Sequence, residues 1–143
     1  MLEQRIVNVA EGEKLGGKIL RKKSVSEKTL DERISNIFVT VGIPAHIKGY
    51  QFLREGIKLA VDNPPIINAI TKSLYPSIAK KFGTTSSKVE RAIRHAIEVA
   101  WNRGKIENIN SVFGVKVYNS SEKPTNGEFI ALLADKMLLE CAY

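Results

Sequence analysis

Apolar residues recur at intervals of three and four positions along most of the chain, the pattern of α-helices that each bury one face. No sustained alternation of the kind that strands require is present, and no repeat or heptad run. We therefore predict an all-α fold, a compact bundle of about six helices. The expected elements are helices over 29–41, 47–61, 66–74, 76–82, 86–102 and from 126 onward, a helical turn at 108–113 and an extended segment at 115–118.

The apolar spacing also predicts which side chains face the core. The helix over 86–102 has the longest buried stripe, which runs from Val89 to Trp101. The other positions expected to point inward are Leu30, Ile34, Ile37, Phe38, Val41, Tyr50, Leu53, Ile57, Leu59, Ala60, Val61, Phe129, Leu132, Leu133, Met137 and Leu138.

Several predicted helix ends carry residues that cap backbone groups. Thr29 with Glu32, and Thr125 with Glu128, fit the capping box, in which a hydroxyl and a carboxylate each accept from a free amide at the helix start. Gly83 suits the left-handed position that ends a helix. These signals predict where three of the helices begin or end.

Residues 1–28 differ from the rest of the chain. Gly16 and Gly17 interrupt any periodicity, and the stretch that follows is polar and basic. We expect residues 1–28 to be a flexible hinge or linker and residues 29–143 to form one domain. The chain has 143 residues, 43% of them hydrophobic, which is enough to fill one core.

Residues 75–94 have the layout of a helix-turn-helix, in which two helices cross steeply through a short turn. Ala79 is the small residue needed where the helices approach, and Gly83 tolerates the positive φ of the turn. The apolar residues expected to lock the pair together are Ile78, Phe82, Val89 and Ala92. An ordinary corner between two helices is the alternative interpretation.

Positive charge concentrates in the same part of the chain. The formal net charge of the sequence is +7, and residues 71–105 hold eight lysines and arginines against two glutamates, a net of +6. A local basic surface is the electrostatic footprint of a polyanion partner. On charge alone, a solvent-exposed basic face that binds no polyanion is an equally good interpretation.

The outer face of the helix over 86–102 carries side chains that can read bases. The first part of the second helix of such a pair enters the major groove of DNA. Arg91 and Arg94 can each present two donors to a guanine, and Glu90 can accept from a cytosine amine. We predict these three as base contacts. Ion pairs of Arg94 with Glu90 and with Glu98, each four positions away, are the structural alternative.

Polar residues around the turn are candidates for contact with the DNA backbone. The predicted backbone contacts around the turn are Lys80, Lys81, Thr84, Thr85, Ser86, Ser87 and Lys88. For the four hydroxyl residues, capping of the helix is at least as good an interpretation. Lys88 is assigned to a phosphate because lysine lacks the planar fork with which arginine holds a base.

The sequence lacks the residue sets of an enzyme or a metal site. His46 and His95 are its only histidines and Cys141 its only cysteine, and neither histidine has a ligand set with metal spacing nearby. There is no phosphate-cradling glycine loop and no run of 18 apolar residues. We expect no catalytic activity, no metal or other cofactor, no small-molecule substrate, no membrane contact, and a cytoplasmic location.

Five motifs follow one another between residues 44 and 126. They are PAHIKGY at 44–50, LYP at 74–76, IAKKF at 78–82, VERAIRHAIEVAW at 89–101 and KPTN at 123–126. Together they resemble the C-terminal effector domain of the stage-zero sporulation master regulator family of endospore-forming bacteria. The resemblance runs from about Asp31 to Leu139, and the motif at 89–101 is its most specific part.

This resemblance implies a DNA-binding domain of a phosphorelay response regulator that controls the start of sporulation. It implies binding to the zero-A box, activation of some promoters and repression of others, and tandem self-association on DNA. Residues 1–28 resemble the end of a receiver domain and its hinge, so the sequence is interpreted as a fragment without that receiver. Glu90, Arg91, Arg94 and His95 match family contacts with DNA, and the resemblance implies that His95 contacts the DNA backbone. Lys88 stands where better-known members carry arginine.

The resemblance also implies a surface for the RNA polymerase sigma factor. The residue pattern itself predicts only that this surface is partly exposed. Its implied residues are Asn108, Asn110, Phe113, Val117, Ala134, Asp135 and Met137.

A non-enzymatic interaction module is the alternative from another functional class. It would be an RNA-binding or regulatory helical domain whose basic helix meets an acidic partner. Glu90 discriminates between the two hypotheses, because a nonspecific polyanion binder gains nothing from a carboxylate among its arginines, whereas a base reader can use it.

Overall fold

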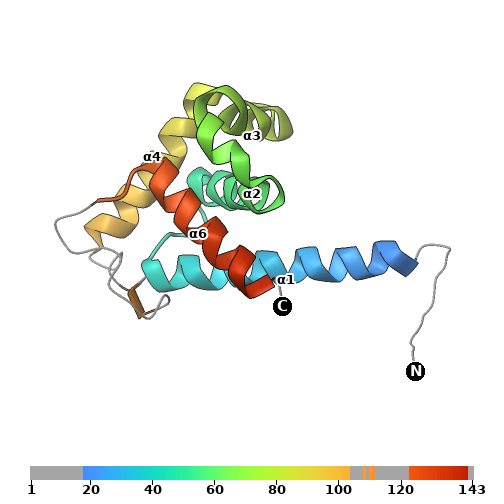
Figure 1. Cartoon of the computed structure of the whole chain (residues 1–143). Coiled ribbons are helices and arrows are strands. Elements are labelled where there is room, and N and C mark those ends of the chain that lie inside the picture. Colours follow the sequence, from blue (N-terminus) through green and yellow to red (C-terminus); the bar gives the residue numbers. More distant parts are fainter. Residues whose placement is uncertain (1–17, 104–107, 109, 112–122, 142–143) are drawn as a thin grey trace. The chain divides into compact units, whose positions relative to one another are not determined.

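The regular elements of the chain are all helical in the residues that a computed structural model describes, which are 18–103, 108, 110–111 and 123–141. The all-α prediction is therefore confirmed. The elements are α1 (Lys18–Val41), α2 (Lys48–Asp62), a 3₁₀ helix η1 (Pro64–Ala69), a π-helical turn η2 (Ile70–Leu74), α3 (Tyr75–Phe82), α4 (Ser86–Asn102) and α6 (Asn126–Cys141) (Figure 1). The extended segment predicted at 115–118 lies outside the described residues.

Helix α1 begins at Lys18, earlier than the sequence pattern predicts. Thr29 therefore lies inside the helix, and the prediction that it begins a helix is wrong. No glycine or proline interrupts residues 18–41, and the leucine, arginine and lysines near the start are good helix formers, so nothing local breaks the helix at Thr29. Residues 18–28, expected to be flexible, are the first turns of this helix. The chain divides into two units between Glu32 and Arg33.

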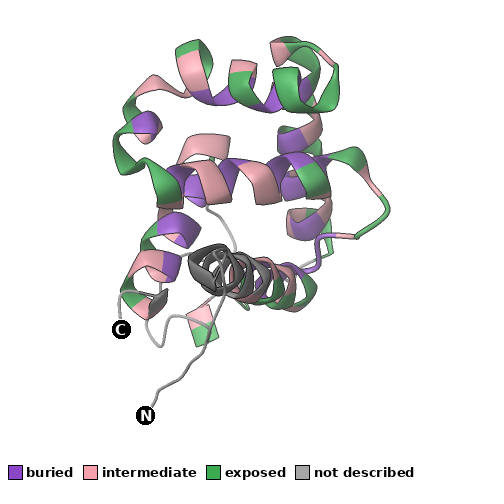
Figure 2. Ribbon diagram, turned by 90° about the vertical axis from the view of Figure 1, so that its right-hand side faces the viewer, coloured by how far each residue is buried: buried purple, intermediate pink, exposed green. Residues whose placement is uncertain are grey.

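The core of the second unit is built around α2. Leu53, Ile57 and Ala60 of this helix are fully buried, and the helix contacts α3, α4 and α6 (Figures 1 and 2). Most of the predicted core is confirmed. Buried residues among the predicted set are Ile34, Ile37, Phe38, Val41, Leu53, Ile57, Ala60, Val89, Ile93, Ala96, Ile97, Ala100, Phe129, Leu133 and Met137.

The segment between α2 and α3 is not the single short helix that was predicted. Pro64 and Pro65 lack amide protons, and the chain forms a tight 3₁₀ helix there. Ala69 then leaves helical geometry, with φ −137° and ψ 46°, and a π turn follows. The π turn runs directly into α3 because Leu74 and Tyr75 both have right-handed helical dihedrals.

The ends of α3, α4 and α6 follow their predicted chemistry. Gly83 ends α3 in the left-handed region, with φ 66°. Thr85 caps α4, and its hydroxyl accepts from the Lys88 amide at 3.3 Å. In the capping box of α6, the Glu128 amide donates to the Thr125 hydroxyl at 3.2 Å and the Thr125 amide to the Glu128 carboxylate at 3.0 Å. Two elements of the candidate site, α4 and α6, therefore have locally encoded starts.

Candidate nucleic-acid interface

Helices α3 and α4 pack as the predicted helix-turn-helix pair. Ala79 is 5% exposed at their approach, and Ile78 and Val89 are fully buried. Phe82, also expected to lock this pair, is 38% exposed and lines a groove beside Ala92 of α4. Its ring also meets Phe52 of α2 edge-on, with ring centroids 5.3 Å apart, so it holds α3 to α2.

Helix α4 separates a buried face from an outer face. Its buried stripe contains Val89 and Ile93, both fully buried, whereas Arg91, Arg94 and His95 are exposed. The structure therefore leaves these three predicted DNA-contacting side chains accessible to solvent. Their contact with bases or phosphates stays a prediction.

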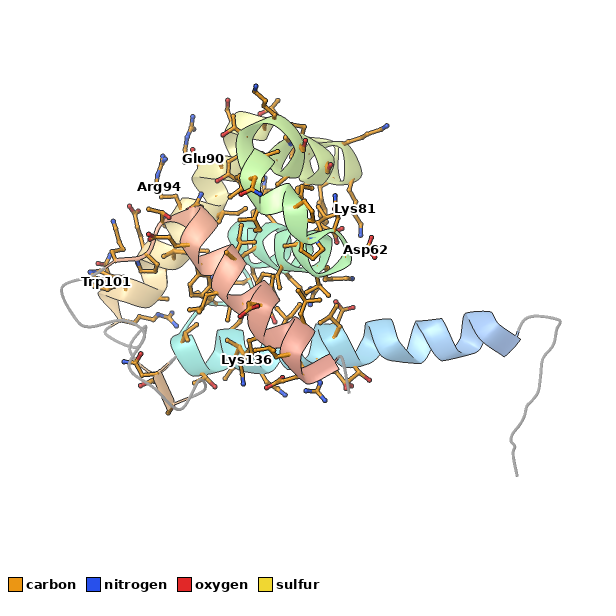
Figure 3. All side chains as sticks on the ribbon, viewed as in Figure 1. Asp62, Lys81, Glu90, Arg94, Trp101 and Lys136 are labelled. Atoms are coloured by element: carbon orange, nitrogen blue, oxygen red, sulfur yellow. The ribbon has the colours of Figure 1, made fainter. Side chains whose placement is uncertain are left out.

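Glu90 and Arg94 form an ion pair on α4 (Figure 3). This is one of the two pairs expected as the structural alternative to DNA contact. The second pair does not form, because Glu98 accepts from Lys123 at 3.3 Å. The Arg94 side chain stays 51% exposed, and an exposed pair of this kind contributes only about 0.3–0.5 kcal/mol. The pair can therefore open when a stronger partner approaches.

Asn126 joins the start of α6 to α4, a contact that sequence reasoning missed. Its Nδ2 donates to the Glu90 carbonyl oxygen at 3.1 Å and to the Tyr75 hydroxyl at 3.0 Å. Burial is the main cause of the raised pKa of Tyr75, the Asn126 hydrogen bond acts in the opposite direction, and the Glu90 charge raises the pKa further. Three elements are thus fastened at the turn of α4 that carries Glu90. The KPTN motif at 123–126, which contains Asn126, was the feature of the sequence that could have indicated this contact.

The predicted backbone contacts surround the α3–α4 turn. Lys80 is exposed, whereas the Lys81 ammonium pairs with Glu55 of α2 at 2.9 Å. Thr85 caps the helix, so the capping interpretation holds for that hydroxyl. The remaining candidates are Thr84 and Ser86, which are half-buried, and Ser87, Lys88 and His95, which are exposed.

Two grooves run along opposite sides of α4. We call the first the α2–α4 groove; it has a volume of about 690 Å³ and is lined by Lys48, Gln51, Phe52, Phe82, Gly83, Thr84, Lys88, Arg91, Ala92 and His95. We call the second the α4–α6 groove; it measures about 390 Å³ and is lined by Tyr75, Glu90, Arg94, Ile97, Glu98, Lys123, Pro124, Thr125, Asn126 and Gly127. The predicted base contacts therefore divide between the grooves, with Arg91 in the first and Glu90 and Arg94 in the second.

The surface expected to meet a sigma factor is only partly accessible. Asp135 is exposed, but Ala134 and Met137 are 4% and 0% exposed, so the expectation of partial exposure is wrong for these two. Both face the core because α6 packs on α2. Asn108 is exposed and donates to the Thr40 carbonyl oxygen at 3.1 Å, and Asn110 is half-buried. The other two members of the predicted set, residues 113 and 117, lie outside the described residues.

Two features of other protein classes are absent from the described ranges. No group of three or more histidine, cysteine, aspartate or glutamate side chains is placed there to hold a metal ion. None of the helices described there has the length and apolar character needed to cross a membrane.

A comparison with protein families gives a match that spans the whole candidate interface. The family model described as "Sporulation initiation factor Spo0A C terminal" matches residues 34–137. The match covers more than half of the chain. It includes α2, α3, α4 and most of α6.

Proposed function

The chain belongs to the family of sporulation initiation factor Spo0A C-terminal domains, and from this premise we propose how it recognises DNA. Membership makes it a DNA-binding effector domain of a transcription factor, a response regulator that acts in sporulation through a two-component phosphorelay. We propose that the domain binds the zero-A box by placing the first turns of α4 in the major groove.

The outer face of α4 carries this proposal. Exposed Arg91 stands opposite the buried stripe of α4 and exposed Arg94 flanks it, so the helix can meet DNA without loss of core packing. Each arginine donates in a bidentate way to a guanine, worth about 1–3 kcal/mol of discrimination. Glu90 leaves its ion pair with Arg94 and accepts from a cytosine amine.

The DNA backbone is contacted around the α3–α4 turn. Lys80 and Lys88 are exposed cations at the two sides of the turn, and His95 lies two turns further along α4. Lys81 exchanges its Glu55 partner for a phosphate, which its ammonium can reach because the Lys81 side chain is 55% exposed. The hydroxyls of Thr84, Thr85, Ser86 and Ser87 are the remaining proposed contacts, with Thr85 also serving as the cap.

The regulatory output is a separate part of the proposal. We propose that exposed Asp135 of α6, with Asn108 and Asn110, meets the RNA polymerase sigma factor at activated promoters. At other promoters the bound domain represses transcription. Two copies bind neighbouring sites in tandem. The exposure of Asp135 supports the first statement, and the others follow from the family resemblance.

Fluorescence anisotropy tests the DNA-recognition proposal. The protein is titrated into a labelled duplex that carries the zero-A box, a scrambled duplex of the same composition, and a single-stranded RNA. We expect the first duplex to bind at least a hundredfold more tightly than the others at a salt concentration near 150 mM, because specific complexes gain base contacts that nonspecific ones lack. Equal binding to all three would support the alternative, a nonspecific basic module, and refute sequence-specific recognition.

A further inference from the structure

The α2–α4 groove is positioned by an unusually close approach of two helices. A Cβ atom at Gly49 would stand 2.2 Å from the Ala92 carbonyl oxygen and 2.8 Å from the Ala96 Cβ. Only glycine fits there, so the first turn of α2 lies directly against the middle of α4. The two residues that flank this contact on α2, Lys48 and Gln51, consequently reach the groove beside α4.

The two grooves that flank α4 differ in charge. Lys48, Lys88 and Arg91 line the α2–α4 groove together with His95, and none of the described residues that line it carries a carboxylate. The α4–α6 groove instead contains Glu90 and Glu98. A polyanion is therefore attracted to the first groove and meets both signs of charge in the second.

The dimensions of DNA place a phosphate backbone beside that first groove. An α-helix with its side chains is about 10–12 Å across, and the major groove of DNA is about 12 Å wide. A recognition helix therefore fills the major groove, and whatever flanks the helix meets the sugar-phosphate backbone at its border. On the Arg91 side of α4, the flanking element is the first turn of α2.

We propose that Lys48 and Gln51 of α2 form a backbone-binding site for the strand that borders α4 on the Arg91 side. The ammonium of Lys48 and the side-chain amide of Gln51 both donate to phosphodiester oxygens, and both side chains are exposed. The site adds affinity for the DNA backbone beside α4 and reads no base itself. This inference rests on the proposed DNA recognition by α4.

Salt-dependent binding separates the charged member of the site from the neutral one. Lys48→Ala should weaken binding to the zero-A duplex and to the scrambled duplex by the same factor, on the order of tenfold. It should also reduce the slope of log affinity against log salt by about 1, because one phosphate contact is lost. Gln51→Ala should weaken binding without changing the slope, and Lys48→Arg should restore the slope.

Lys58→Ala is the matched control, since Lys58 lies on the same helix but does not line the groove. It should leave both the affinity and the slope unchanged. Thermal unfolding of each variant is measured in parallel; Lys48 and Gln51 are exposed, so both variants should melt with the wild type. If Lys48→Ala matches Lys58→Ala in affinity and slope, the proposed site is wrong.

Duplexes with one phosphate replaced by a neutral methylphosphonate locate the contact. One replacement should weaken the wild-type protein while leaving the Lys48→Ala variant unaffected, since that variant has already lost the contact. Additive losses at every position would overturn the proposed site. The preference of the wild-type protein for the zero-A duplex over the scrambled duplex tests recognition by α4 separately. A wrong site at Lys48 and Gln51 can therefore be distinguished from a failure of that recognition.

Discussion

The close approach of α2 to α4 makes Gly49→Ala the substitution with the clearest structural consequence. The new Cβ would lie 2.2 Å from the Ala92 carbonyl oxygen, whereas ordinary contacts begin near 3.4 Å. The obstructing atom belongs to the backbone of α4 and cannot rotate away. The first turn of α2 must therefore move away from α4 by about 1 Å, which reopens packing around Ala96.

The magnitude follows from two opposed effects. Replacing glycine by alanine in a helix stabilises a protein by roughly 0.5–1 kcal/mol, while overpacking costs typically 1–3 kcal/mol, and more when the neighbour cannot yield. Because the contact at Gly49 is with backbone, we expect a net loss of about 2 kcal/mol in the free energy of unfolding. For a domain of this size that lowers Tm by roughly 10 °C.

Gly56→Ala is the matched control on the same helix. The atoms nearest to its Cβ would be the ends of Ile78, Ile130 and Leu74, at 3.4–3.6 Å. This variant should be neutral or more stable by up to about 1 kcal/mol. Urea denaturation and thermal melting measure both variants. If Gly49→Ala is as stable as Gly56→Ala, the close approach and the placement of the α2–α4 groove are both wrong.

Two further predictions concern α6. Asn126→Asp removes both donors that reach Glu90 and Tyr75, so it should lower the free energy of unfolding at pH 7 by about 1–3 kcal/mol; wild-type stability in urea would contradict the network. The hydrogen bond from Lys136 is the main cause of the lowered pKa of Glu140. Ionised Glu140 therefore stabilises the fold above pH 4.5, and this stabilisation is lost as the pH falls through the lowered pKa. Glu140→Gln should therefore lose less stability than the wild type when urea denaturation is repeated from pH 6 to about pH 3; identical pH profiles would refute it.

Local chemistry made the ends of the central helices predictable from sequence. A left-handed glycine at Gly83, a hydroxyl cap at Thr85 and the capping box at Thr125 depend on residues within four positions of one another. The start of α1 was predicted wrongly because that prediction also depended on local chemistry alone. A strong local signal at Thr29 suggested a helix start, but continuous helix-forming residues extend the helix back to Lys18.

Contacts between residues far apart in the sequence determine the features that could not be predicted from sequence. The role of Gly49 depends on the α4 backbone, and that of Asn126 on an atom 36 positions away. At Met137, two inferences disagreed. Helical spacing predicted a buried side chain, whereas the family resemblance implied a contact with a partner. The structure shows that Met137 is buried. Periodicity was the better guide there because it depends directly on packing.

The base contact of Arg91 is the central claim, and a comparison of two proteins on a series of duplexes tests it most directly. Anisotropy is measured for the wild-type protein and for Arg91→Ala on the zero-A duplex and on duplexes with each guanine replaced in turn. The wild type should lose about 1–3 kcal/mol of binding free energy at one guanine, and Arg91→Ala should show no further loss at that position. If Arg91→Ala weakens every duplex equally and keeps the wild-type discrimination, then Arg91 is a phosphate contact and α4 does not read bases as proposed.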